Sequence, residues 1–212
     1  MTRVHLIGIC GTAMATLAAL LRHRGYDVRG SDQHVYPPMS DFLAAERIPV
    51  LEGYKAEHID DAIDLVVVGN AISRGNPELE VVLERRIRHQ SLPEAIRDHF
   101  LWQARSVVIA GTHGKTTTTS LAGWILTHGG VDPTVLVGGI ALNLGEHGSS
   151  YRVGAPSAPF VIEGDEYDSA FFDKTAKFLK YLPHIAVVNN IEFDHADIYD
   201  DLDAVRQNPP GE

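Results

Sequence analysis

The sequence predicts an α/β protein with a Rossmann-like parallel-sheet domain at the N-terminus, followed by a second domain of the P-loop type. Apolar runs of strand length alternate with helix-like segments along the chain. Two of the strand-to-helix junctions are rich in glycine, and a polar stretch at 103–106 separates two such series. We therefore predict two domains, residues 1–104 and residues 105–212.

The first series opens with the strand VHLIGI and a helix near residues 12–23. The short strand YDVRG, a helix near 39–46, the strand DLVVVGNAI and a helix starting at Pro77 follow. The stretch LPEAIRDHFLWQARS, residues 92–106, has the apolar spacing of one further helix. This order predicts a parallel sheet with helices on its faces.

The second series starts with the strand VVIA at 107–110 and the loop GTHGKTT. A helix through 120–128 is ended by Gly129 and Gly130, and the strands TVLVGG, PFVIEGD and HIAVVNN follow. Residues 142–159 are rich in Gly, Ser and Pro and are expected to form one long loop.

The bulk composition is that of an ordinary globular protein of 212 residues, with 44% hydrophobic and 22% charged residues. A formal charge of -10 argues against non-specific binding to nucleic acid or to an anionic membrane. The single cysteine, Cys10, lies among glycines and is expected to fit a tight turn. With one cysteine no intrachain disulfide can form, so a cytoplasmic location is the default expectation. No apolar run is long enough to span a bilayer.

The loop GTHGKTT is the strongest candidate for a phosphate site. Glycines let successive N–H groups face an anion at the start of a helix, where the helix dipole adds about half a positive charge. Lys115 is then expected along the outer phosphates, with the Thr116 hydroxyl on Mg²⁺. Ile109 stands where the generic nucleotide loop has its first glycine, and a threonine-capped helix start with a surface lysine is the alternative. The predicted ATP-binding residues are Gly111, Thr112, His113, Gly114, Lys115, Thr116 and Thr117.

Two later strands end in groups that suit a metal ion. Glu163 closes an apolar run and is the predicted partner of Thr116 at the metal, because the carboxyl ends of parallel strands meet at one sheet edge. His195 follows the last strand and is expected to bind a second cation or contact the transferred phosphoryl group. Asp165, Glu166 and Asp168 form either an outer layer of this site or a solvated acidic loop.

The first glycine loop, GICGTAM, only partly matches a dinucleotide fingerprint, because Cys10 and Ala13 replace two glycines. A turn that feeds N–H groups into a helix start still suits a diphosphate. Asp32 either binds a ribose hydroxyl or caps a turn, and Asn76 with Pro77 predicts a helix start. The residues expected to hold this ligand are Gly8, Gly11, Thr12, Asp32, Ser73 and Arg74.

The ordered set GICGTAM, AISRGNPE, GTHGKTTT, EGDEYD and NNIEFDH resembles the Mur ligase family of ATP-dependent amide-forming enzymes. The resemblance implies that the first loop binds a UDP-sugar and that ATP and Mg²⁺ are cofactors. It implies that Lys115 and His195 are catalytic and that Thr116, Glu163 and His195 hold metal. Family members continue beyond the point where DDLDAVRQNPPGE ends, so an incomplete P-loop-type ATPase central domain without ligase turnover is expected.

The motifs GICGT, VYPPMS, GNAISRGNP and EYDSAFFDKTAKF favour the family branch that recycles cell-wall peptides. The implied substrates are UDP-N-acetylmuramate and the murein tripeptide L-Ala-γ-D-Glu-meso-diaminopimelate, joined through an acyl phosphate. The alternative within the family uses L-alanine as the amine. An NAD-dependent oxidoreductase and a nucleotide-controlled binding module are the alternatives outside it.

Overall fold

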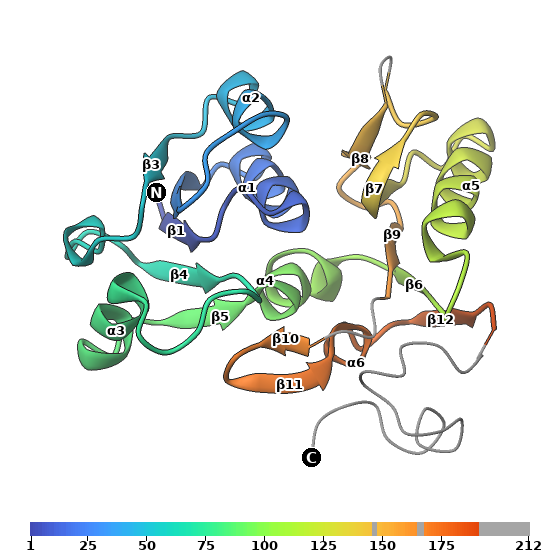
Figure 1. Cartoon of the computed structure of the whole chain (residues 1–212). Helices are drawn as coiled ribbons and strands as arrows, with labels where there is room; N and C mark the ends of the chain where they lie inside the picture. Colours follow the sequence, from blue (N-terminus) through green and yellow to red (C-terminus); the bar gives the residue numbers. More distant parts are fainter. Residues whose placement is uncertain (146–147, 165–167, 191–212) are drawn as a thin grey trace. The chain divides into compact units, whose positions relative to one another are not determined.

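The computed structural model describes residues 1–145, 148–164 and 168–190. The chain divides into two compact units (Figure 1). The first holds Met1–Ala95 with Ala170–Phe172, and the second holds Ile96–Ser169 with the chain from Asp173. This division lies inside helix α4 (Leu92–His99), whereas the domain boundary after residue 104 stays a prediction.

The first unit alternates strands and helices around one sheet. Its elements are β1 (Arg3–Ile7), α1 (Thr12–His23), β2 (Asp27–Asp32), α2 (Met39–Ala45), β3 (Val50–Glu52), the short 3-10 helix η1 (Ala56–His58), β4 (Leu65–Val68), α3 (Pro77–Glu84) and β5 (His89–Ser91). The strand order is β3-β2-β1-β4-β5, and every pair is parallel. This confirms the Rossmann-like prediction.

The strand order reverses between β1 and β4, which lie side by side with Val4 opposite Leu65 and Ile7 opposite Val68. In open sheets of this kind, connections from two such strands leave toward opposite sides, and ligands usually bind outside the carboxyl ends at this point. The first glycine loop follows β1, and the segment with Ser73 and Arg74 follows β4. The topology therefore places both predicted ligand-binding segments at one edge.

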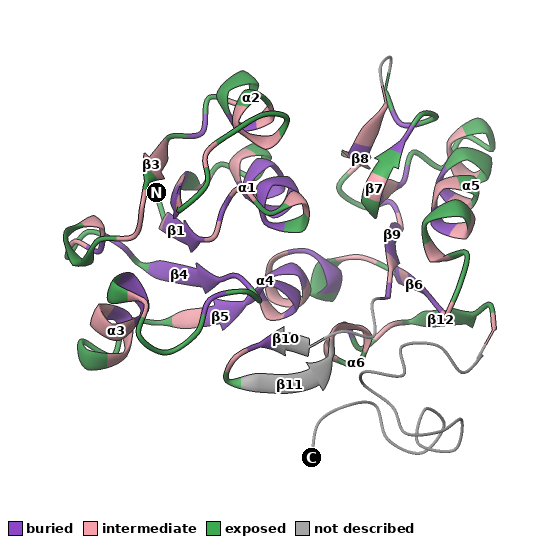
Figure 2. Ribbon diagram, viewed as in Figure 1, coloured by how far each residue is buried: buried purple, intermediate pink, exposed green. Residues whose placement is uncertain are grey.

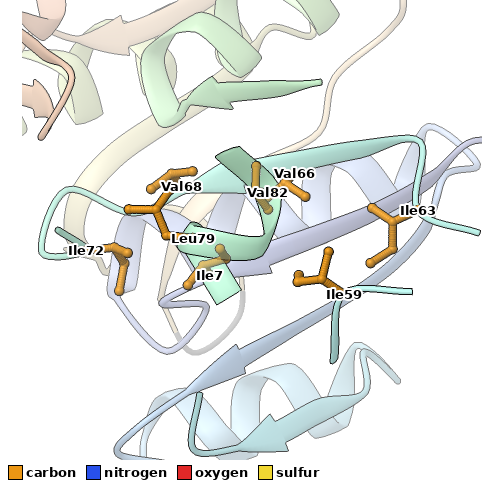
Figure 3. Close-up of a cluster of buried hydrophobic side chains, with 8 residues drawn as sticks. All are labelled: Ile7, Ile59, Ile63, Val66, Val68, Ile72, Leu79 and Val82. Carbon is orange, nitrogen blue, oxygen red and sulfur yellow. The ribbon is translucent and has the colours of Figure 1, made fainter. Parts of the chain in front are cut away.

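Both faces of this sheet are covered. On one side α1 buries every residue from Met14 to Leu21, because small alanines let it approach the sheet closely (Figure 2). On the other side α3 packs on β1 and β4. Figure 3 shows the buried apolar cluster there: Ile7, Ile59, Ile63, Val66, Val68, Ile72, Leu79 and Val82. Continuous apolar strands such as LVVV are typical of sheets buried on both faces.

The second unit is built on a mixed sheet. Its elements are η2 (Leu101–Gln103), β6 (Ser106–Ala110), α5 (Lys115–His128), β7 (Thr134–Ala141), β8 (Ser149–Arg152), β9 (Phe160–Glu163), β10 (Asp168–Ala170), β11 (Asp173–Ala176), α6 (Lys177–Lys180) and β12 (Ile185–Val188), of which Ala170 alone belongs to the first unit. The sheet order is β12-β6-β9-β7-β8, and only the β7–β8 pair is antiparallel. Strands β6, β9 and β12 therefore end at the same edge.

Several elements differ from the sequence-based expectation. The predicted long loop at 142–159 contains the strand β8, which pairs with β7. Its polar sequence, SSYR, gives no apolar run that would predict a strand. The strands β3 and β5 have only three residues each and escape a search for apolar runs. The helix predicted for 92–106 ends at His99, where Phe100 leaves helical geometry with φ -131°.

Within the described ranges, none of the helices is both long and apolar enough to cross a bilayer.

Candidate active site

The phosphate loop joins the buried strand β6 to α5. Gly114 is the N-cap of α5 and has φ 78°, a left-handed conformation that favours glycine. Gly111 has φ 133°, and a Cβ atom there would lie 2.9 Å from the carbonyl oxygen and 3.1 Å from the amide nitrogen of Asn190. Both the backbone angle and the approach of the neighbouring strand end therefore require glycine at position 111.

The end of β12 braces this loop. The Thr112 amide donates to the Asn190 carbonyl over 3.1 Å, and the His113 amide donates to Asn190 Oδ1 over 3.0 Å. The adjacent Asn189 Nδ2 donates to Thr118 Oγ1 in α5 over 2.9 Å. The loop thus takes its shape from a strand more than seventy residues away, which pre-orders it for a ligand.

Lys115 is the first residue of α5. Its ammonium donates to the Gly111 carbonyl over 2.9 Å and to the Thr112 carbonyl over 3.2 Å. The cation therefore lies against the loop that the sequence assigns to the outer phosphates of ATP. A cation next to the positive end of a helix favours an anion locally, even in a chain of negative net charge, and the binding of phosphates here stays a prediction.

Thr116 and Glu163 meet as the sequence predicts. The Thr116 hydroxyl donates to Glu163 Oε2 over 2.8 Å, and the two residues come from α5 and from the end of β9. A hydroxyl and a carboxylate are oxygen ligands that suit Mg²⁺, which is usually held by one or two carboxylates together with substrate phosphates. These two residues fit a Mg²⁺ ion at the phosphate loop. Elsewhere in the described chain, no group of three or more His, Cys, Asp or Glu side chains has the geometry of a metal cage.

The second predicted metal ligand, His195, lies outside the described residues. So do Asp165 and Glu166, and the Asp168 side chain is not described. The structure therefore brings together the phosphate loop, Thr116 and Glu163, while the role of His195 stays a prediction.

The first glycine loop is tied to β2. The amides of Gly8 and Ile9 both donate to the Ser31 carbonyl, over 2.9 and 3.0 Å. The next amide, that of Cys10, donates to Asp32 Oδ2 over 2.8 Å. The loop then enters α1 with Gly11 as its N-cap and no acidic residue in the first turn, which leaves the positive helix end without a carboxylate of its own.

Asp32 has the position predicted for a ribose ligand, at the carboxyl end of β2. Its carboxylate also caps a turn, because Oδ1 accepts from the His34 amide over 3.1 Å. Burial, and then the charge of Asp32, raise the pKa of Cys10 to about 11. Burial, and then the same charge, raise the pKa of Tyr54 to about 12. Both groups are therefore neutral at physiological pH.

In the segment after β4, the predicted ligand-binding residue Arg74 already has a partner within the chain. Its guanidinium pairs with Glu80 in two hydrogen bonds, Nε to Oε1 over 2.9 Å and Nη2 to Oε2 over 3.0 Å. The bond from Arg74 lowers the pKa of Glu80. Ser73 accepts the Asn76 amide at its carbonyl just before α3, so both residues lie at the predicted edge. Glu80 therefore already takes two of the five N–H donors of Arg74, and contact of Arg74 with a diphosphate stays a prediction.

Two family models match the chain almost end to end. The model of the Mur ligase family catalytic domain matches residues 3–101, and the model of the Mur ligase middle domain matches residues 109–208. The chain belongs to the Mur ligase family. The two glycine loops of this Mur ligase fall one in each matched region.

Among its relatives, the chain is 47% identical over 207 residues to UDP-N-acetylmuramate–L-alanyl-gamma-D-glutamyl-meso-2,6-diaminoheptandioate ligase of Haemophilus influenzae. The match covers 98% of this chain and 45% of that protein. The UDP-N-acetylmuramate–L-alanine ligase of Salinibacter ruber is 41% identical over 209 residues, covering 96% and 40%. The chain thus spans less than half the length of these curated relatives.

A solved structure of a Mur ligase is also similar to this chain. The UDP-N-acetylmuramate:L-alanyl-gamma-D-glutamyl-meso-diaminopimelate ligase from Neisseria meningitides superposes with a TM-score of 0.90 at 43% identity, covering 97% of this chain and 65% of that one. The similarity supports the assignment of a Rossmann-like unit and a P-loop-type unit in this Mur ligase.

A buried carboxylate behind the first loop was missed by the sequence reasoning. Glu78, in the first turn of α3, is fully buried and accepts from His5 Nε2 over 3.1 Å and from Ser31 Oγ over 2.5 Å. Its other oxygen accepts from His58 Nδ1 over 2.7 Å and from the Lys55 amide over 3.2 Å. Burial alone would raise the pKa of Glu78, but the bonds from His5 and Ser31, the charge of His5 and the bond from His58 together lower it.

The network matters to the site because it holds Ser31, whose carbonyl fixes the first glycine loop. In the sequence, GNPELE reads only as a capped helix start, and the Asn76 side chain does accept from the Glu78 amide over 3.0 Å. Asn189 and Asn190 appear in the sequence only as the polar end of the last predicted strand, HIAVVNN. Their place beside the phosphate loop follows from β12 lying next to β6.

Proposed function

We propose that the protein that carries this chain is an ATP-dependent ligase, which joins UDP-N-acetylmuramate to the tripeptide L-Ala-γ-D-Glu-meso-diaminopimelate. The first unit would bind the UDP-sugar and the second the triphosphate of ATP. The observation that carries the proposal is the Thr116–Glu163 contact beside a braced phosphate loop, in a chain 47% identical to a curated ligase of this specificity.

The chemistry is a phosphoryl transfer followed by an acyl transfer. The lactyl carboxylate of the sugar attacks the γ-phosphorus of ATP, ADP leaves, and an acyl phosphate forms. The tripeptide amine then attacks the acyl carbon, inorganic phosphate leaves, and the amine loses a proton as the amide forms. In such reactions the protein contributes mainly position and electrostatic stabilisation.

The residues of the second unit would divide these tasks. The loop amides and the N-terminus of α5 orient the phosphate chain, and Lys115 neutralises charge that develops on the transferred group. Thr116 and Glu163 would hold Mg²⁺, which neutralises phosphate oxygens when bound. His195 would contribute to a second cation, as the family resemblance implies. A cytoplasmic location is part of this proposal, because ATP is the phosphoryl donor.

Ligation of L-alanine is the second candidate function, because a relative of that specificity is 41% identical to this chain. The two functions share the sugar and ATP sites and differ only in the amine. A full-length ligase that carries this sequence would decide between them through phosphate release with each amine in turn. Faster release with L-alanine than with the tripeptide would overturn the main proposal.

The 212-residue chain itself allows a simpler test. Calorimetry should detect UDP-N-acetylmuramate binding, and Asp32→Asn should weaken it by about 10-fold, the loss of roughly 1.4 kcal/mol from one hydrogen bond to a charged group. Trp102→Phe, in the second unit, serves as the control variant and should bind as the parent does. If about 1 mM ligand gives no heat, the binding free energy is weaker than about -4 kcal/mol. That result would contradict the assignment of UDP-sugar binding to the first unit.

A further inference from the structure

Strand β7 carries two adjacent glycines, Gly138 and Gly139, beside the predicted metal site. The strand pairs in parallel with β9, with Leu136 opposite Ile162, the residue before Glu163. On its other side its pairing with β8 is irregular between Leu136 and Ala141, the stretch that holds both glycines. Glycine inside a strand marks an irregularity or a close approach of another group.

The close approach at Gly138 is made by the Glu163 carboxylate. A Cβ atom at position 138 would overlap Glu163 Oε1 and would lie 3.2 Å from Glu163 Cδ. At Gly139 the corresponding atom would lie 3.8 Å from Thr116 Cγ2, an ordinary contact distance. The two neighbouring glycines therefore differ sharply in the space that they leave open.

Backbone conformation does not explain the glycine. Neither Gly138 nor Gly139 has φ in the left-handed region, so neither position has the backbone angle that favours glycine. What an alanine at 138 would meet is the far end of a flexible side chain. Glu163 would move aside at little cost to the fold, but it would leave the position from which Oε2 accepts the Thr116 hydroxyl.

We propose that Gly138 is a positioning residue, whose missing side chain provides the space in which Glu163 reaches Thr116. The inference rests on the proposed function, in which Glu163 and Thr116 hold Mg²⁺ at the phosphate loop. Gly138 itself touches neither metal nor nucleotide in this role. Its effect on the reaction passes entirely through the orientation of the Glu163 carboxylate.

The test compares Gly138→Ala with the matched control Gly139→Ala in the 212-residue chain. Calorimetry with a non-hydrolysable ATP analogue, at increasing Mg²⁺ concentration, should show the apparent Mg²⁺ affinity about 10-fold weaker in Gly138→Ala, the lower range for loss of a group that orients a metal ligand. Gly139→Ala should stay within about 3-fold of the parent, since it displaces no ligand. The thermal midpoints should agree to within about 3 °C, the shift for roughly 1 kcal/mol in a chain of this size.

A crystal structure of Gly138→Ala without nucleotide gives the second readout. We expect Thr116 Oγ1 and Glu163 to have separated beyond hydrogen-bond distance, whereas in Gly139→Ala the bond should persist. Shortening the acid provides a rescue: Glu163→Asp should weaken Mg²⁺ binding less in the Gly138→Ala background than in the parent chain, because aspartate avoids the added methyl group.

The outcomes separate the two proposals. If the parent chain binds no Mg²⁺-nucleotide, the proposed function fails for this unit, and the Thr116–Glu163 distance still decides the role of Gly138. If that distance is unchanged in Gly138→Ala, the positioning role is overturned. A weaker nucleotide affinity with the bond intact would instead mean that Gly138 makes room for the ligand, which also overturns it.

Discussion

The buried Glu78 offers the most quantitative prediction. Glu78→Ala removes one partner of a fully buried pair with His5 and leaves Ser31 Oγ, His58 Nδ1 and an amide without their acceptor. Breaking such a pair from one side typically costs about 3–5 kcal/mol. We expect the free energy of unfolding of the first unit to fall by this amount.

Glu78→Gln should cost less. The amide oxygen can still accept from His58 and from the Lys55 backbone, while the amide nitrogen must donate to His5 Nε2 and Ser31 Oγ. His5 then carries its proton on Nδ1, which has no hydrogen-bond partner in the described chain. A buried unpaired donor costs about 1–3 kcal/mol, so the expected loss is in that range.

The pH dependence has a definite sign. Because the pKa of Glu78 is lower in the folded state than its ordinary value of 4.5, its contribution to stability is fully present above pH 4.5. The contribution is lost as the pH falls through the lowered folded-state pKa. The stability difference between the parent chain and Glu78→Gln should therefore narrow only below pH 4.5.

The assay must follow the first unit alone. Both tryptophans, Trp102 and Trp124, belong to the second unit, so their fluorescence follows the wrong part of the chain. Hydrogen exchange of peptides from β1 and the first glycine loop, in increasing urea, reports on the correct unit. The control is Glu80→Gln, a partly exposed acid in the same helix turn; losing its surface pair with Arg74 should cost little stability, so exchange should change far less than in Glu78→Ala. The reasoning fails if Glu80→Gln and Glu78→Ala accelerate exchange equally.

Three further predictions concern the two loops. With its pKa raised to about 11, Cys10 should react with iodoacetamide at pH 8 about 90-fold more slowly than a thiol of pKa 9.0, and unfolding in guanidinium should restore the ordinary rate. Lys115→Ala should weaken binding of an ATP analogue by about 10- to 100-fold in calorimetry, from the 1.5–3 kcal/mol of a hydrogen bond to a charged group, and an unchanged affinity would remove the lysine from the site. Gly111→Ala should destabilise the second unit by about 1–3 kcal/mol, because it combines φ 133° with a clash against Asn190, and denaturation followed by Trp124 fluorescence measures this loss.

The sequence was sufficient for those parts of the site that depend on local pattern. A glycine-rich turn between strand and helix identifies the phosphate loop, and the rule that parallel strands end at one edge brings Glu163 to Thr116. The domain boundary and the roles of Lys115, Asp32 and Arg74 in ligand binding stay predictions. The position of Arg74 against Glu80 shows that one of these groups already has a partner.

The sequence was insufficient where a residue acts through a distant neighbour. Nothing in GNPELE indicates that the Glu78 carboxylate turns inward to histidines from β1 and η1, because that depends on how α3 packs on the sheet. The proposed role of Gly138 likewise depends on a side chain from another strand, that of Glu163 at the end of β9. Short polar strands such as β8 pair at a sheet edge without an apolar run to reveal them.

The brace between the phosphate loop and Asn190 has a consequence for the order of folding. The chain from Gly111 to Gly114 does not fix its own shape, because the amides of Thr112 and His113 both donate to Asn190. Asn190 follows these two residues by 78 and 77 positions, so the ribosome adds it much later. During synthesis, strand β6 and helix α5 emerge long before β12 arrives to pair with them. The phosphate loop therefore reaches its final shape late, when the last described strand completes the sheet.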